Sequence, residues 1–154
     1  MFSLEYGYNN LWVTFGAYTT TFNPGPVNKR GISRLRNTEW NNIRYDSIQN
    51  TVQSNVYNLN KTSINPLDPS QVFISSFQSG LLNIEAEESI ELLNDSNSGL
   101  ESIPSFQTIR ISGTVFDNDA NLWVLNSIIQ KPLKRFNPTT NQWTSYDFSS
   151  IISN

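Results

Sequence analysis

Three polar residues late in the sequence have the spacing of a calcium-binding loop. Asp117, Asp119 and Asn121 match the first, third and fifth positions of such a loop, where oxygen ligands are required. The sixth position, which needs glycine for a sharp turn, is Leu122, and the twelfth, which should be a bidentate glutamate, is Ile128. We therefore interpret the segment as a polar hairpin turn and predict no metal site.

Two pairs of acidic residues, Glu87 with Glu88 and Asp117 with Asp119, are of the type that glycosidases use. Such enzymes hold two carboxyl groups across a cleft, about 5–10 Å apart. No pattern in the sequence places either pair across a cleft, and solvated turn residues are the favoured interpretation. The chain has no histidine and no cysteine, which excludes Ser-His nucleophiles and argues against zinc sites. No Ser-x-x-Lys motif is present. We predict a protein that is not an enzyme and needs no cofactor.

The four tryptophans are candidates for a sugar-stacking platform or for structural packing. Trp12 and Trp123 recur at matching places in repeated motifs, as do Trp40 and Trp143. This recurrence favours packing between repeats over ligand contact. Tyr18 and Tyr8 are not repeated in this way, so they are better candidates for exposed contacts.

A repeated tetrapeptide is the main clue to the fold. Residues 10–13 (NLWV) recur unchanged at 121–124, and a degenerate copy, QVFI, occupies 71–74. Trp12 and Trp123 are 111 positions apart, and Phe73 precedes Trp123 by 50. A step of roughly 50 residues is close to the ~40–50-residue blades of β-propeller repeats. The sequence therefore predicts an all-β chain of about three propeller blades, approximately 1–50, 56–98 and 106–154.

Each predicted blade is a four-stranded antiparallel meander with polar turns, and little or no helix is expected. The segment Glu85–Leu93 also allows a helix because of its glutamates, although a strand is favoured. The predicted strands are 2–6, 11–15, 31–36 and 40–45; 62–65, 72–75, 80–85 and 89–93; and 109–116, 122–125, 133–136 and 143–148.

Loops on a rigid repeat are where binding residues tend to lie. The first blade carries a long insertion, Gly16–Arg30, between its second and third strands. We expect the second-to-third-strand loops of the three blades to share one face of the molecule and to form the binding surface. The predicted binding residues are Tyr18, Arg30, Gln78, Asn126 and Lys131.

Composition narrows the class of partner. Hydrophobic residues make up 37% and charged residues 15% of the chain, and the net charge is −3. No basic surface of the kind that tracks nucleic-acid phosphates is predicted. No apolar run approaches the 18 residues of a membrane span. The first residues lack the pattern of a signal peptide and are expected to lie within a strand.

Several motifs resemble known propeller families. Residues 117–124 (DNDANLWV) resemble the D-x-x-G-N-L-W-V mark of two-component-regulator-type propeller repeats, with Ala120 in place of the turn glycine. Residues 63–76 (SINPLDPSQVFISS), followed by the GLL of 80–82 and by 94–100, are similar to PorZ-type propellers of Bacteroidetes. Residues 11–16 (LWVTFG) and 30–33 (RGIS) resemble the same family, which is associated with type IX secretion at the cell surface.

The resemblance implies a non-catalytic binding or scaffold module at the bacterial cell surface or in the periplasm. Its ligand would be a protein or a glycan such as lipopolysaccharide. The alternative is the ligand-sensing propeller of a hybrid two-component regulator; a propeller hydrolase is a third and less favoured hypothesis. Propellers close with about 4–8 blades, so three blades leave two open ends. We therefore expect either a homodimer that forms a six-blade ring or a segment of a larger propeller.

Overall fold

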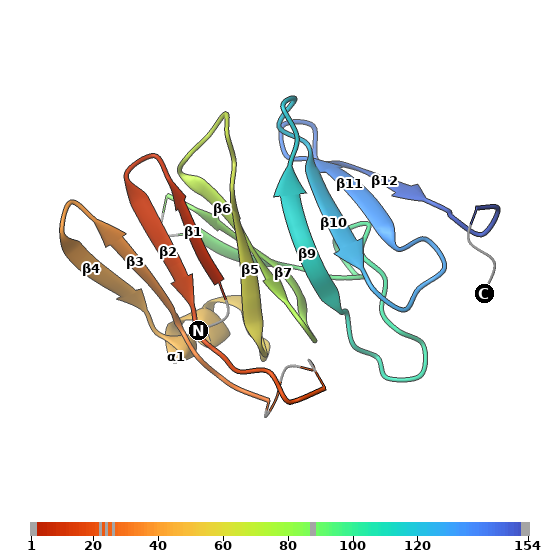
Figure 1. The fold of residues 1–154 in the computed structure, drawn as a ribbon, viewed down its shortest axis with the longest axis horizontal. Coiled ribbons are helices and arrows are strands. Elements are labelled where there is room, and N and C mark those ends of the chain that lie inside the picture. The colour runs from red at the N-terminus through yellow and green to blue at the C-terminus, as the bar shows by residue number, and fades with distance from the viewer. Residues whose placement is uncertain (1–2, 22, 24, 26, 87–88, 152–154) are drawn as a thin grey trace.

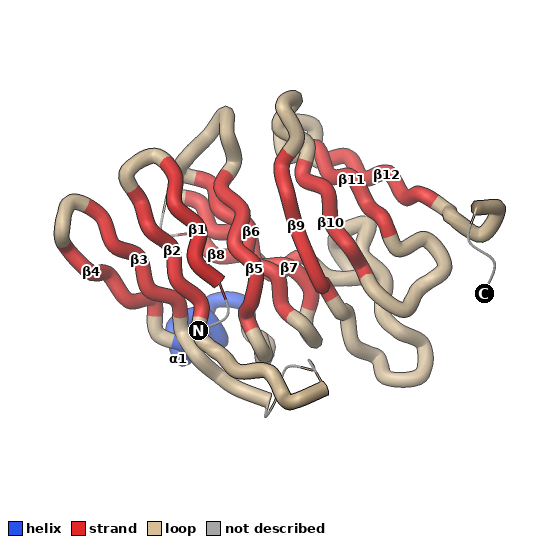
Figure 2. The backbone as a smooth tube through the Cα atoms, viewed as in Figure 1, coloured by secondary structure: helices blue, strands red, loops and turns tan. Residues whose placement is uncertain are grey.

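A computed structural model describes residues 3–21, 23, 25, 27–86 and 89–151 of the chain. The described residues form three four-stranded antiparallel sheets, one after another along the sequence (Figure 1). Figure 2 shows that strands and their connecting turns account for nearly all of the backbone. The prediction of an all-β chain built from four-stranded meanders is confirmed.

In each sheet the strands follow one another in sequence order, which is the topology of a propeller blade. The strands of blade 1 are β1 (Ser3–Gly7), β2 (Asn10–Thr14), β3 (Ile32–Arg36) and β4 (Glu39–Ile43). The strands of blade 2 are β5 (Leu59–Ile64), β6 (Gln71–Ser76), β7 (Gly80–Glu85) and β8 (Ser89–Leu93). The strands of blade 3 are β9 (Ile111–Phe116), β10 (Leu122–Asn126), β11 (Leu133–Asn137) and β12 (Gln142–Tyr146).

A short helix, α1 (Tyr45–Val52), follows blade 1, where we expected the fourth strand to continue to residue 45. Its residues 45, 48 and 52 lie on one face because they are three and four positions apart. Ile48 on that face is fully buried in the core between blades 1 and 2. The helix ends at Val52, and the next residue, Gln53, adopts the left-handed conformation with a φ of 52°. The helix that Glu85–Leu93 allowed is absent from the described part of that segment, where β7 ends and β8 begins; residues 87 and 88 lie outside the described residues.

Alternating side chains on β6 pack into two separate cores, one on each face of blade 2. Val72 and Ile74 belong to a cluster that contains Trp12 of blade 1. Phe73 points to the other face and joins a cluster that contains Leu122 of blade 3. All six residues of β6 are buried. Blade 2 is therefore covered on both faces, because successive side chains of a strand point to opposite faces of the sheet and here both sets are buried.

The first strands of the three blades are neighbours. Strand β5 contacts both β1 and β9, so these strands form the inner side of the fan of blades. Lys61 Nζ on β5 lies 3.3 Å from a carboxylate oxygen of Glu5 on β1. On the other side, the hydroxyl oxygens of Ser63 and Thr114 lie 2.9 Å apart.

The tryptophans differ in their packing. Trp12 is only 3% exposed and packs between blades 1 and 2. Trp143 stacks on Phe136 with ring centroids 4.5 Å apart and packs on the core between blades 2 and 3. The expectation of packing between blades is wrong for Trp40, which is 56% exposed. Register does not explain the difference, because Trp40 pairs with residue 35 as Trp143 pairs with residue 136. Trp143 lies on the face of blade 3 that packs on blade 2, whereas Trp40 lies on the face of blade 1 that points away from blade 2.

Candidate functional site

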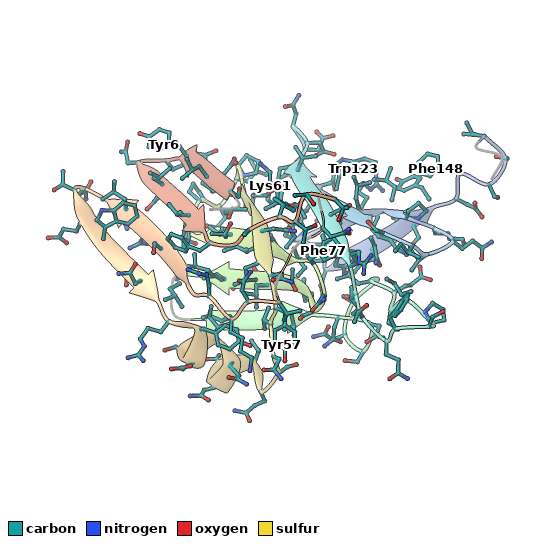
Figure 3. All side chains as sticks on the ribbon, turned by 60° about the horizontal axis from the view of Figure 1, so that its bottom comes forward. Tyr6, Tyr57, Lys61, Phe77, Trp123 and Phe148 are labelled. Atoms are coloured by element: carbon teal, nitrogen blue, oxygen red, sulfur yellow. The ribbon has the colours of Figure 1, made fainter. Side chains whose placement is uncertain are left out.

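The loops between second and third strands lie along one edge of the molecule, at the bottom of Figure 1. The connections between blades, 44–58 and 94–110, lie along the same edge, because four antiparallel strands return the chain to the end where it entered. We call these segments, with 77–79, 127–132 and the described residues of 15–31, the loop edge. Figure 3 turns this edge towards the viewer.

Two predicted residues lie in the long β2–β3 segment. Tyr18 is exposed and lines a small hollow over the inner strands, together with Asn60, Lys61 and Thr114. Arg30 is exposed and lines a different, shallow hollow beside Ser33. The loop edge therefore holds both residues, but they do not share one site.

Two further predicted residues belong to the β10–β11 region of blade 3. Lys131 is exposed beside Asp147. Hydrogen bonds from Ser149, with a smaller contribution from Lys131, hold the pKa of Asp147 below its ordinary value. Asn126, by contrast, is fully buried. It accepts a hydrogen bond from the backbone N–H of Glu101 (2.7 Å) and donates one to the Glu101 carbonyl (3.1 Å). Its side chain fixes the segment between blades and is not accessible to a ligand.

Gln78 lines a cleft of about 360 Å³ on the loop edge, between blades 2 and 3. The turn that carries Gln78 is fixed by two backbone hydrogen bonds: Ile109 donates to the Gln78 carbonyl and Gly80 donates to the Ile109 carbonyl, each at 3.2 Å. The Gln78 side chain is half-buried. The cleft is lined by Ser54, Asn55, Tyr57, Gln78, Ser79, Leu92, Asn94, Asp95, Gln107, Thr108 and Ile109.

Cations lie over aromatic rings beside this cleft. The Lys29 ammonium is 5.6 Å from the ring centre of Tyr57 and 5.8 Å from that of Tyr45. The Arg110 guanidinium lies 4.4 Å from the ring centre of Phe77. These distances suit cation–π attraction. Tyr57 and Phe77 are labelled in Figure 3 on the loop edge.

The neighbouring Tyr45 connects α1 to the cleft. Burial raises the pKa of Tyr45, although its hydroxyl accepts a hydrogen bond from the backbone N–H of Val56 (3.2 Å), which acts in the opposite direction. The same hydroxyl donates to Asn55 Oδ1 at 3.3 Å. Asn55, which lines the cleft, is thereby held in place by a side chain anchored in the core.

Polar donors and acceptors dominate the chemistry of the cleft. Four amide side chains and several hydroxyls line it, and Asp95 is the one carboxylate among the described lining residues. General acid–base hydrolysis of glycosides uses two convergent carboxyl groups, which this lining does not offer. Within the described ranges, no group of three His, Cys, Asp or Glu side chains is placed to hold a metal ion. The arrangement is suited to hydrogen bonding and ring stacking.

The sequence reasoning missed the contribution of the connections between blades. Tyr57, Asn55, Asn94 and Gln107 all come from them. A signal was available, because the even number of strands in each blade places these connections on the same edge as the second-to-third-strand loops.

The Asp117 turn has the structural role that the sequence predicted. Its carboxylate accepts hydrogen bonds from the indole Nε1 of Trp123 (2.8 Å) and from the backbone N–H groups of Asn121 (2.8 Å) and Asp119 (3.0 Å). Partial desolvation raises the pKa of Asp117, but these hydrogen bonds outweigh it and hold the pKa below its ordinary value. Ala120 adopts a φ of 57°, so the turn uses the left-handed region where glycine is usual.

Comparison with known proteins supports the fold. No protein-family model and no curated protein matches the sequence. Among solved structures, the chain is similar to PorZ of Porphyromonas gingivalis, described as an essential bacterial surface component of the type IX secretion system. The TM-score is 0.83 over 97% of this chain, at 15% sequence identity. This chain has the fold of a segment of PorZ. The resemblance to PorZ-type proteins is confirmed at the level of the fold, and the chain spans about a fifth of the length of the PorZ chain. None of the described helices is long and apolar enough to span a membrane.

Proposed function

We propose that the chain is a non-catalytic binding module that acts at the bacterial cell surface or in the periplasm as part of type IX secretion. The observation that carries the proposal is the likeness to the surface component PorZ over nearly the whole chain. The polar cleft at the loop edge supports a binding role, because its residues come from turns held on rigid blades.

The ligand that suits the cleft best is a glycan, such as the sugar portion of lipopolysaccharide. Gln78 and Gln107 each offer a donor and an acceptor, the pair of groups that a sugar hydroxyl requires. Asn55 and Asn94 offer their Nδ2 donors, because the Oδ1 atom of each already accepts two hydrogen bonds within the chain. Tyr57 adds an aromatic ring, and its neighbour Lys29 adds a positive charge 5.6 Å from that ring. An anionic sugar would be attracted by this ammonium group.

Calorimetric titration with lipopolysaccharide-derived oligosaccharides tests the proposal. We expect the wild-type chain to bind, and Tyr57→Ala and Gln78→Ala each to weaken binding about tenfold, which corresponds to about 1.4 kcal/mol. Gln142→Ala, an exposed glutamine on β12, is the matched control and should bind as the wild type does. Thermal unfolding of each variant confirms that the fold is kept. Absence of binding, or binding that is equal in all variants, would contradict the proposal.

A further inference from the structure

The tryptophans of the repeated tetrapeptide differ in what their indole N–H groups bind. In blade 3, Trp123 Nε1 donates to the Asp117 carboxylate at 2.8 Å. Trp12 occupies the equivalent position in blade 1 and is only 3% exposed. Its Nε1 atom is buried and finds no acceptor within the described part of the chain. A buried donor without an acceptor destabilises a fold, so an acceptor supplied from outside would be bound with a gain in free energy.

Register shows why blade 1 lacks this acceptor. In both blades, the second residue of the tetrapeptide pairs with the residue that precedes the turn, so Gly7 takes the position of Asp117. A Cβ atom built on Gly7 would lie 3.2 Å from Ile64 Cδ1 of blade 2. The neighbouring blade leaves little room for a side chain at this position, and the acceptor for Trp12 has to come from elsewhere.

Trp12 lines a pocket of about 170 Å³ between blades 1 and 2, on the edge opposite the loop edge, at the top of Figure 1. Tyr8 of the β1–β2 turn and Ser70 of the β5–β6 turn contribute to its walls. The Tyr8 hydroxyl donates to the Pro66 carbonyl at 2.9 Å, which ties these two turns together. The walls of the pocket are therefore held by a contact between the blades.

Two cations of β3, Arg34 and Arg36, line the same pocket. Arg34 pairs with Trp12 in the register, and its guanidinium carbon lies 5.7 Å from the centre of the Trp12 ring. Burial, and then repulsion from Arg36, lower the pKa of Arg34, so a negative charge beside it would be favourable. None of the described lining residues is an aspartate or a glutamate. Each guanidinium has five N–H donors and can bind an anion while it keeps its contacts within the chain.

Asn10 adds a second unsatisfied group to the lining. Its Nδ2 donates to the Tyr8 carbonyl at 2.9 Å, but its buried Oδ1 meets no donor among the described residues. A ligand that satisfies both Asn10 and Trp12 needs an anionic oxygen and a hydroxyl group. A carboxylate suits the anionic part, because it matches the planar fork of a guanidinium and is the group that Trp123 binds in blade 3.

We propose that this pocket binds a small hydroxy acid. Its carboxylate is held by the two arginines and accepts the Trp12 indole N–H, and its hydroxyl donates to Asn10 Oδ1. The ligand thereby does in blade 1 what the Asp117 side chain does in blade 3. The pocket and the cleft that contains Gln78 lie on opposite edges of the blades, so this proposal goes beyond the proposed function and stands without it.

Nuclear magnetic resonance of the indole N–H groups tests the proposal, with glycolate as the probe. The chain has four tryptophans, and the Trp12 signal is identified by its loss in Trp12→Phe. At constant ionic strength, sodium glycolate should shift the Trp12 signal until it saturates. The Trp123 signal should stay in place, because that indole is already bonded to Asp117. Glycolamide, the neutral amide of the same acid, should shift neither signal.

Two arginine variants show whether the pocket is the site. Arg36→Gln should weaken glycolate binding about tenfold, because it removes a charged donor. Arg36 is exposed, so the fold should be kept, as the dispersion of the amide signals checks. Arg135→Gln is the matched control, because Arg135 pairs with Trp123 as Arg34 pairs with Trp12, and it should bind as the wild type does. An unmoved Trp12 signal, an equal shift with glycolamide, or equal binding by both variants would overturn the proposal.

A further variant asks whether the chain supplies a carboxylate of its own. Glu87 and Glu88, which lie outside the described residues, directly follow the lining residue Ala86 in the sequence. We expect glycolate to bind both the wild type and the variant Glu87→Gln/Glu88→Gln. Binding by the variant alone would mean that a carboxylate of the chain occupies the site, and it would also overturn the proposal.

Discussion

Asp117 shows how a single side chain organises a blade turn. Four donor groups converge on its carboxylate: the Trp123 indole, the backbone N–H groups of Asn121 and Asp119, and the side-chain amide of Asn121. The residue types alone predicted this turn. A calcium loop requires glycine at its sixth position and glutamate at its twelfth, and these positions hold Leu122 and Ile128, so a polar hairpin turn was the remaining interpretation. The burial of Asn126 was not predictable in this way, since its partner, Glu101, is 25 positions away along the chain.

The lowered pKa of Asp117 predicts how stability depends on pH. In the folded state its pKa lies below the ordinary value of 3.8, so the unfolded chain binds more protons at low pH. The stabilisation is present above pH 3.8 and is lost as the pH falls through the folded-state value. Urea unfolding over this range should show a smaller loss of stability for Asp117→Asn than for the wild type. The control Asp119→Asn, in the same turn, should behave as the wild type does; equal slopes for all three proteins would contradict the assignment.

At the scale of elements, the segment between blades 2 and 3 is attached to blade 3 by an ion pair with a buried ammonium group. Lys134 on β11 is fully buried, and its ammonium group contacts the Glu101 carboxylate and lies 2.9 Å from the Ser145 hydroxyl.

The positions of the strands were predictable from the sequence, because alternating apolar residues and turn residues mark each strand. Helix α1 was missed because it interrupts the repeat, and its apolar spacing spans only two turns. The ion pair joins positions 33 apart and has no local sequence signal.

Breaking this ion pair from one side should be costly. Glu101→Ala leaves a buried ammonium group with one hydroxyl partner, and we expect the free energy of unfolding to fall by about 3 kcal/mol. The double variant Glu101→Ala/Lys134→Met should recover most of this loss, because the buried charge is removed together with its partner. Chemical denaturation measures both. Asp46→Ala, which breaks an exposed ion pair with Arg44, is the control and should have no measurable effect. A double variant as unstable as Glu101→Ala would contradict this account.

At the scale of the whole molecule, the three blades and their order were predictable because the repeated tetrapeptide marks the second strand of each blade. The exposure of Trp40 was not, because burial depends on whether another blade covers its face. The same repeat that places Trp12 in a core therefore leaves Trp40 and Tyr6 on an open face of the fan.

Calorimetric titration of the chain with lipopolysaccharide-derived oligosaccharides tests the proposed binding module most directly. We predict saturable binding of the wild-type chain, which Tyr57→Ala and Gln78→Ala each weaken about tenfold, because both side chains line the cleft at the loop edge. Gln142→Ala, at an exposed position of β12, should bind as the wild type does. Absence of binding, or equal binding by all of these proteins, would contradict the account.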